Sequence, residues 1–331
     1  MTLRTPLCDL MGIEFPVFLA GMGGVSFAEV CAAVSKAGGF GTLGMAASSP
    51  DEIRSQMREV RRLTDKPFGV DLLASLPETL EASVEVIIEE GASAFVAGLG
   101  IPRTVIARFH EAGVKVFSMC GRVEHALAAA DAGCDAVVAQ GTEAGGHTGH
   151  VAGMALIPQI VDSVDIPVLA AGSIVDGRGL AAALAFGAHG VWLGTRFVAS
   201  REARAAKSYK QAILEAGSSD TIVTRCYSGK SMRVLRNAYV DEWVNRTDEI
   251  LSFAAQSELS YREGVMNLSL DNYEDMDPDR SCMPTGQGCG RIDDLLSAGE
   301  IVHRVVEEAC QTLARMQMLV VESSSRSHHN G

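Results

Sequence analysis

The sequence has no apolar run of about 18 residues, which is the length that a membrane-spanning helix needs. Its N-terminus also lacks the long apolar segment of a secretory signal. Basic residues are in the minority, because 28 lysines and arginines stand against 41 aspartates and glutamates, a formal net charge of −13. A nucleic acid and an anionic membrane both require basic surface, so we expect neither as a partner.

Cysteine is present but shows no ligand pattern. Eight cysteines are scattered along the chain, and none forms the two-residue spacing of a zinc or redox site. Several lie inside apolar runs, as buried free thiols do. We therefore expect a reduced, cytoplasmic protein. The 331 residues, 47% of them hydrophobic, suffice for one large domain or two ordinary ones.

Short apolar runs recur along the chain, and each ends in glycine or small residues before a helical pattern begins. Eight such runs start about 21–32 residues apart, the length of one strand-plus-helix unit. Near-continuous apolar character is typical of strands buried on both faces of a parallel sheet. The runs are Phe15–Ala20, Gly39–Met45, Phe68–Ala74, Ala94–Leu99, Lys115–Cys120, Ala136–Gly141, Val168–Ser173 and Gly190–Thr195.

The number and even size of these units favour one α/β architecture. Eight strand–helix units predict a closed (β/α)8 TIM barrel, with an open doubly wound sheet as the competing arrangement. Helical patterns fill the intervals, among them Pro102–Gly113. The segments A-G-V-K-V-F, A-G-C-D-A-V-V and F-G-A-H-G-V-W repeat one device, in which glycine ends a helix just before a buried strand.

The strand–helix rhythm stops after Thr195, and the remaining sequence predicts further parts. We expect residues 1–200 to form the barrel, which would bind the cofactor. Residues 201–290 would form a mostly helical lid inserted over the barrel mouth and would begin with a long helix over Ser200–Ala216. Residues 291–322 would form a C-terminal helix that returns to the barrel wall, and residues 323–331 a disordered tail.

The candidate chemistry lies where the strands end, because active sites in such barrels are found at the C-terminal ends of the strands. The sixth run passes into a loop of small and polar residues, Gln140 to His147, which packing cannot explain. His147 follows two glycines, whose main chain can adopt unusual dihedrals. Its imidazole, with an ordinary pKa of about 6.5, suits proton transfer near neutrality.

The loops after the seventh and eighth runs point to a phosphate. Such barrels commonly bind phosphate there, through backbone N–H groups and a helix N-terminus. Gly172-Ser173 and Gly194-Thr195 supply glycine for close approach and hydroxyls as donors. Gly145 and Gly146 add further N–H groups from the sixth loop.

A phosphate held at these loops would leave the rest of a cofactor across the barrel mouth. Gly21, Met22 and Gly23 would let it lie against backbone, and Asp71 and Gln140 carry side chains able to bond a flat heteroaromatic edge. This arrangement fits FMN better than a nicotinamide dinucleotide, because no G-x-G-x-x-G opens a first strand–helix unit.

These motifs resemble a known family. The stretch A-Q-G-T-E-A-G-G-H-T-G, together with F-P-V-F-L-A-G-M-G, F-G-V-D-L-L, V-L-A-A-G-S-I-V-D-G-R-G and W-L-G-T-R-F, resembles the nitronate monooxygenases, formerly called 2-nitropropane dioxygenases. The resemblance covers roughly residues 5–240. It implies an FMN-binding TIM barrel with a second domain, and oxidation of alkyl nitronates, with nitroalkanes as a further substrate class.

The resemblance also implies roles for individual residues. His147 would be the catalytic base that takes the proton α to the nitro group, or would position an anionic nitronate. The flavin would accept one electron, and O₂ would react with the organic radical. FMN contacts are implied at Gly21, Met22, Gly23, Gln140, Gly145, Gly146, Gly172, Gly194 and Thr195.

Two positions depart from the family pattern. Asp71 stands where asparagine is usual, and an ionised acid there would meet the pyrimidine edge of the flavin only as an acceptor. Ser173 stands where a second glycine is usual and adds a hydroxyl donor.

Related FMN-dependent enoyl-acyl-carrier-protein reductases share nearly all these motifs. In them the flavin takes hydride from NAD(P)H and passes it to an enoyl thioester, so an enoyl thioester is the alternative substrate to a nitronate with O₂. A barrel that binds phosphate ligands without catalysis is a third possibility. We expect a monomer or a homodimer.

Some polar residues have an ordinary alternative interpretation. His147 and His150 have H-x-x-H spacing, but without a carboxylate or cysteine at ligand spacing we predict no metal site. Glu143 would hydrogen-bond His147 or a loop amide, or lie in solvent. Lys230, Arg233 and Arg236 form a basic cluster that would meet an anionic substrate or lie on a solvated helix face.

Overall fold

The structure is a computed structural model that describes residues 3–46, 48–75, 77–266 and 276–320. The tail expected at 323–331 lies outside the described residues, as do the last two residues of the range 291–322. Part of an acidic run at 271–279 also lies outside them.

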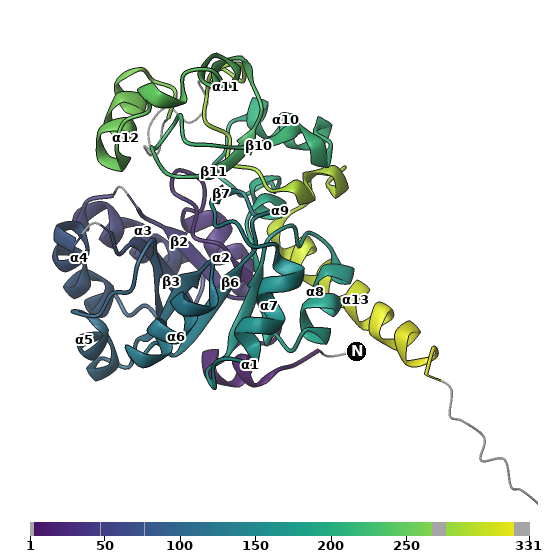
Figure 1. The fold of residues 1–331 in the computed structure, drawn as a ribbon. Helices are drawn as coiled ribbons and strands as arrows, with labels where there is room; N and C mark the ends of the chain where they lie inside the picture. The colour runs from purple at the N-terminus through teal and green to yellow at the C-terminus, as the bar shows by residue number, and fades with distance from the viewer. Residues whose placement is uncertain (1–2, 47, 76, 267–275, 321–331) are drawn as a thin grey trace, which may run out of the picture.

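Eight parallel strands form the barrel, and all eight expected strands are present (Figure 1). In space they follow the order β1-β9-β8-β6-β5-β4-β3-β2. A parallel bridge between Phe18 and Phe40 joins β1 to β2 and closes the ring, which confirms the TIM barrel. The strands are β1 (Val17–Leu19), β2 (Gly41–Gly44), β3 (Phe68–Leu73), β4 (Ala94–Gly98), β5 (Lys115–Cys120), β6 (Ala136–Gln140), β8 (Val168–Ala171) and β9 (Gly190–Leu193).

Helices cover the outside of the barrel, and local sequence sets where they begin and end. Ser49 forms a capping box with Glu52 at the start of one helix, in which Pro50 is the first residue. Gly133 and Gly187, with φ of 95° and 87°, follow two helix ends as the repeated segments predicted. The helices are α2 (Ala28–Lys36), α3 (Pro50–Leu63), α4 (Pro77–Glu89), α5 (Ile106–Glu111), α6 (Val123–Asp131), α7 (Gly153–Val161) and α8 (Gly177–Ala185).

Helix α5 is shorter than the range Pro102–Gly113 expected from the sequence. The amide of Val105 donates to the carbonyl of Pro102 at 3.1 Å, so the residues after the proline form a tight turn before the helix begins. The prediction was therefore wrong by about one turn at the N-terminal end.

The barrel interior is a packed core and not a pore. Large side chains on or next to the strands, including Phe18, Phe40, Phe117 and Trp192, fill it. Helix α1 (Pro6–Met11) closes the end of the barrel opposite the strand C-termini with buried apolar side chains. Ligand space is therefore confined to the other end of the barrel.

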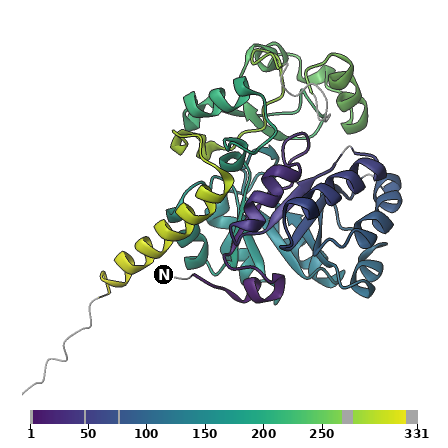
Figure 2. The ribbon, with the colours of Figure 1, turned by 180° about the vertical axis from the view of Figure 1, so that it is seen from behind.

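The described part of the segment 201–290, which is called the lid below, lies over that other end (Figure 2). It contains helices and also two strands that the sequence did not predict, β10 (Thr221–Thr224) and β11 (Met232–Leu235). These strands form a three-stranded antiparallel sheet with β7 (Gly146–His147), which comes from the barrel loop. The helical elements are α9 (Thr195–Val198), which precedes the segment, α10 (Lys207–Glu215), η1 (Ser218–Asp220), α11 (Ala238–Trp243), η2 (Thr247–Glu249), α12 (Phe253–Arg262) and η3 (Gln287–Arg291).

The helix expected over Ser200–Ala216 begins only at Lys207. Residues between α9 and α10 instead cross from the barrel to the lid. The buried side chains of Ala205 and Ala206 pack there with Tyr209 and Ile213.

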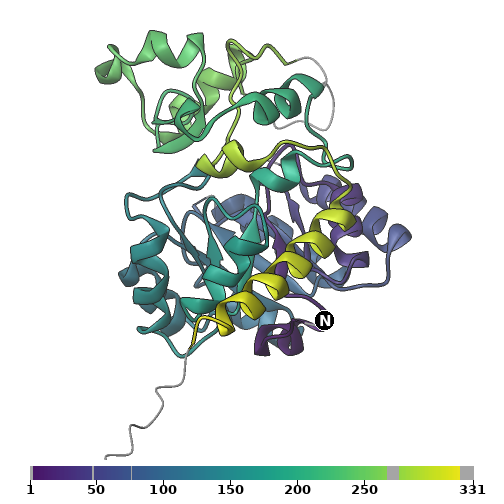
Figure 3. The ribbon, with the colours of Figure 1, turned by 90° about the vertical axis from the view of Figure 1, so that its right-hand side faces the viewer.

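Helix α13 (Ala298–Gln317) leaves the lid and runs down the outside of the barrel beside α8 (Figure 3). Its apolar side chains Ile301, Val302 and Val305 join the main core, and the Glu308 carboxylate accepts a hydrogen bond from the Gly177 amide at 2.9 Å. Among the described residues, no helix combines the length and the apolar character needed to cross a membrane.

Candidate active site

A cavity of about 1010 Å³ lies between the carboxyl ends of the barrel strands and the lid. Every site residue predicted from the sequence lines this cavity, although the residues come from five different strand ends. They are Gly21, Met22, Gly23, Asp71, Gln140, Gly145, Gly146, His147, Gly172, Ser173, Gly194 and Thr195. The structure therefore brings the predicted residues together, while their roles stay predictions.

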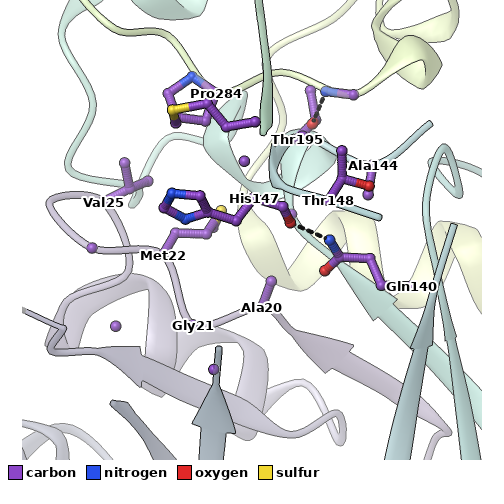
Figure 4. Close-up of a pocket in the computed structure, with 18 of the residues that line it drawn as sticks. Ala20, Gly21, Met22, Val25, Gln140, Ala144, His147, Thr148, Thr195 and Pro284 are labelled. Atoms are coloured by element: carbon purple, nitrogen blue, oxygen red, sulfur yellow. Dashed lines mark hydrogen bonds between the residues drawn. The ribbon is translucent and has the colours of Figure 1, made fainter. Parts of the chain in front are cut away.

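The loop after β6 is fixed at both ends. The Gln140 side-chain amide donates a hydrogen bond to the His147 carbonyl at 2.5 Å, which Figure 4 draws as a dashed line. The Thr148 hydroxyl donates to the Gly141 carbonyl at 3.0 Å. Gly146 has a φ of 75°, which L side chains rarely adopt, and it pairs with Arg233 of β11. The loop is thus part of the lid sheet.

The His147 imidazole lies in an environment built mainly by the lid. Its Nε2 is 2.8 Å from the Ser228 hydroxyl, and the Phe253 ring packs edge-to-face against it with 5.8 Å between ring centres. The Lys230 ammonium lies over the same Phe253 ring, 4.5 Å from its centre. Burial, with a smaller effect from the Lys230 charge, lowers the pKa of His147 to about 4. The ring is therefore neutral at physiological pH.

The loops after β8 and β9 meet the lid as well as the cavity. Ser173 has a φ of 50°, in the left-handed region, and its hydroxyl donates to the Glu143 carbonyl at 3.2 Å. The Thr195 hydroxyl oxygen accepts a hydrogen bond from the Gly286 amide at 3.0 Å. The Ser173 hydroxyl is therefore directed at the protein, whereas the Thr195 hydroxyl still has its proton to donate.

Glu143 bonds a loop amide, one of the alternatives that the sequence left open. Its carboxylate oxygens lie 3.0 and 3.1 Å from the amide nitrogen of Gly153, the first residue of α7. A carboxylate at a helix N-terminus accepts hydrogen bonds from free N–H groups and interacts favourably with the positive end of the helix dipole. Glu143 thus holds the loop to α7 and makes no described bond to His147.

The predicted basic cluster divides into three environments. Lys230 lines the cavity. Arg233 is buried and bonds the Thr142 carbonyl and the Thr221 hydroxyl, both at 3.0 Å. Arg236 is exposed and pairs with Asp241 at 2.6 Å. Only Lys230 is placed to meet a ligand.

Cysteine and histidine provide no metal-binding group in the described part of the chain. No set of three or more Cys, His, Asp or Glu side chains there could hold a metal ion, and His150 is exposed at the cavity edge. The eight cysteines are buried free thiols. This distribution agrees with the apolar runs in which several of them lie.

Sequence reasoning missed two residues that contact His147, namely Ser228 and Phe253. The wholly β-branched stretch T-I-V-T and the largely apolar M-R-V-L, which flank a glycine-containing loop, carry a hairpin signal that predicts β10 and β11. That hairpin would have placed Ser228 at its turn. No local pattern marks Phe253, because its place beside His147 depends on how α12 packs.

Comparison with known proteins agrees with this geometry. The profile of the nitronate monooxygenase family matches residues 4–308. The chain belongs to this family. Family membership makes it an oxidoreductase, and the nitronate monooxygenase family is generally flavin-dependent.

Individual relatives of this nitronate monooxygenase family member have different names. A (3aS,4S,5R,7aS)-5-hydroxy-7a-methyl-1-oxo-octahydro-1H-indene-4-carboxyl-CoA dehydrogenase from Mycobacterium tuberculosis is 35% identical, over 97% of this chain and 100% of the relative. A probable nitronate monooxygenase from Staphylococcus saprophyticus is 34% identical, over 78% of this chain and 86% of the relative. The solved structure of FabK from Thermotoga maritima is 36% identical with a TM-score of 0.87, covering 96% of this chain and 100% of that one.

Proposed function

We propose that this chain binds FMN in the cavity and oxidises alkyl nitronates with O₂. The observation that carries the proposal is the convergence of all the predicted cofactor and catalytic residues on one cavity of about 1010 Å³, at the strand ends. This volume lies at the upper end of small-molecule sites, roughly 300–1000 Å³, so it suits a nucleotide cofactor together with a substrate.

The residues present fit a flavin. A Cβ added at Gly146 would meet no atom within 4 Å, so the backbone there is open to a ligand. The buried Asp71 and the half-buried Gln140 would face the polar edge of the isoalloxazine ring. Gly172, Gly194 and Thr195 would hold the phosphate. When bound, the flavin supplies the electron acceptor for the oxidation.

The electrostatics at His147 favour a nitronate over a neutral nitroalkane. With a pKa of about 4, His147 is too weak a base to take the α proton from a neutral carbon acid efficiently. A nitronate has already lost that proton and carries a negative charge. The nearby Lys230 would attract this anion, and neutral His147 would hydrogen-bond and orient it.

Colour and oxygen consumption test the proposal. The purified protein should show flavin absorbance and consume O₂ with propionate 3-nitronate in the absence of NAD(P)H. Replacing His147 with alanine should lower kcat/KM for the nitronate by about 10- to 100-fold with flavin retained, because a hydrogen bond to a charged group contributes about 1.5–3 kcal/mol. His110→Ala is the matched control, because His110 lies on α5, outside the cavity, where its ring pairs with Asp135. A protein without flavin affinity would refute the proposal.

Thioester chemistry is the second candidate. The M. tuberculosis relative named above is described as acting on a CoA thioester, and the cavity volume leaves space for a larger substrate than a nitronate. This candidate predicts rapid anaerobic bleaching of the flavin by NADH or NADPH, followed by reoxidation on addition of an enoyl thioester.

A further inference from the structure

Asp71 is a buried acid with an unusual position. It lies in β3, between Gly44 of β2 and Val96 of β4, and the residue is 9% exposed at the wall of the cavity. The backbone of Gly21 crosses directly over it, since a Cβ added at Gly21 would lie 2.6 Å from the Asp71 Oδ2. The carboxyl group is therefore enclosed on the barrel side and open only toward the cavity.

No opposite charge accompanies this carboxyl group. The three segments packed against it, residues 20–24, β2 and β4, contain no titratable side chain. Within the described chain, no group donates a hydrogen bond to the Asp71 carboxylate oxygens. Burial alone raises the pKa of Asp71 well above its ordinary value, with no charged neighbour contributing. An unpaired buried charge is costly, so the site favours the protonated acid.

A neutral carboxylic acid presents a different edge from a carboxylate. It offers one O–H donor beside one carbonyl acceptor, whereas the ionised form offers acceptors only. The side-chain amide of asparagine, which is usual at this position in the family that the sequence resembles, also offers one donor face and one acceptor face. Protonated Asp71 therefore offers the same pairing of one donor and one acceptor as asparagine. From the sequence alone, aspartate in place of asparagine would suggest that the hydrogen-bond donor is lost.

We propose that Asp71 recognises the flavin as a neutral acid, donating its O–H to a carbonyl oxygen of the pyrimidine edge and accepting a hydrogen bond from the adjacent ring N–H. This inference rests on the cofactor of the proposed function and adds the protonation state of one binding residue. Its consequence is a pH limit on cofactor affinity that an asparagine at the same position does not impose.

Flavin affinity as a function of pH tests the inference. Apoprotein of the wild type, Asp71→Asn and Asp71→Leu would be titrated with FMN between pH 5 and 9, followed by quenching of flavin fluorescence. We expect wild-type affinity to fall by about tenfold or more as Asp71 ionises, because an ionised acceptor then faces the carbonyl oxygen. Asp71→Asn should bind about as tightly as the wild type at low pH and show no such fall. Asp71→Leu should bind weakly throughout.

An infrared difference spectrum gives a second readout that does not depend on flavin. Wild-type apoprotein minus Asp71→Asn should show a protonated-carboxyl C=O band at neutral pH, and thermal melting would confirm that each variant is folded. Equal pH profiles for the wild type and Asp71→Asn, or the absence of the carboxyl band, would overturn the inference and leave the proposed function intact. Failure of every variant to bind FMN would overturn both.

Discussion

The barrel loops and the lid approach the same cavity with different chemistry. On the barrel side, the wall contains much glycine backbone, and Asp71 and Gln140 are among its polar side chains. On the lid side, Ser228, Lys230 and Phe253 surround His147 with a hydroxyl, a cation and a ring. The barrel side suits a flat cofactor lying against backbone, and the lid side sets the charge and orientation of the histidine.

Because of this difference, we expect mutations in the barrel wall and mutations in the lid to have different effects. A side chain added to the glycine wall would overlap the barrel, as at Gly21, or take the space of the cofactor, as at Gly146. Such changes should abolish cofactor binding. Lid side chains act through His147, so changes there should alter rate and substrate preference with the flavin retained.

The largest effect should come from Gly21→Val on the barrel side. Any Cβ at this position overlaps Asp71, so the loop must move away from the cavity wall. We expect the variant to purify with little or no flavin, measured by absorbance per protein. Gly299→Ala in α13 is the control, because the nearest atom to its added Cβ is 3.7 Å away. Full flavin content in Gly21→Val would show that the flavin does not lie closely against the Gly21 backbone.

On the lid side, Lys230→Met should change the pH dependence. The Lys230 charge helps to lower the pKa of His147 to about 4, so its removal should raise that pKa toward the ordinary value of 6.5. Activity requires neutral His147, so the loss of kcat/KM on acidification should begin at a higher pH than in the wild type. The KM for an anionic nitronate should also rise, by about tenfold.

Arg236→Met is the matched control for Lys230→Met, because Arg236 is exposed and paired with Asp241. It should leave the pH profile in place. An unshifted pH profile in Lys230→Met would show that the Lys230 charge does not lower the pKa of His147. It would contradict the role given to the lid side chains.

Ser228→Ala should lower kcat by roughly fivefold to tenfold with flavin affinity unchanged, because one neutral hydrogen bond contributes about 1 kcal/mol. Ser228 acts as a positioning residue through its 2.8 Å contact with His147 Nε2. Ser228→Thr keeps the hydroxyl and should restore most of the rate. Equal loss in the alanine and threonine variants would point to packing and not to the hydrogen bond.

The smallest effect should come from Ser173→Gly. The left-handed φ of 50° costs a serine about 1 kcal/mol, and glycine removes this strain. The hydroxyl's bond to the Glu143 carbonyl is lost at the same time, so the net free energy of unfolding should rise by less than about 1 kcal/mol. Thermal melting measures it, and a clear fall in stability would mean that the hydrogen bond outweighs the strain.

The sequence predicted the barrel and much of one side of the cavity. Buried parallel strands are short apolar runs with glycine at their ends, so all eight could be located, and the strand-end rule then grouped the cavity residues. The lid was predicted less well. Its sheet depends on the pairing of β7 with β11, in which His147 faces Met232, 85 positions along the chain, and Gly146 faces Arg233, 87 positions along. No local periodicity encodes such a contact. The environment of Asp71 also required the structure, because composition alone cannot show that Gly21 encloses it.

Anaerobic reduction of the bound flavin tests the central claim most directly. The holoenzyme would be mixed, without O₂, with propionate 3-nitronate or with NADH or NADPH, and flavin absorbance followed over time. Our account predicts that the nitronate bleaches the flavin and that the pyridine nucleotides do so slowly or not at all. Rapid bleaching by NAD(P)H with no response to the nitronate, and recovery of the colour on adding an enoyl thioester, would contradict it.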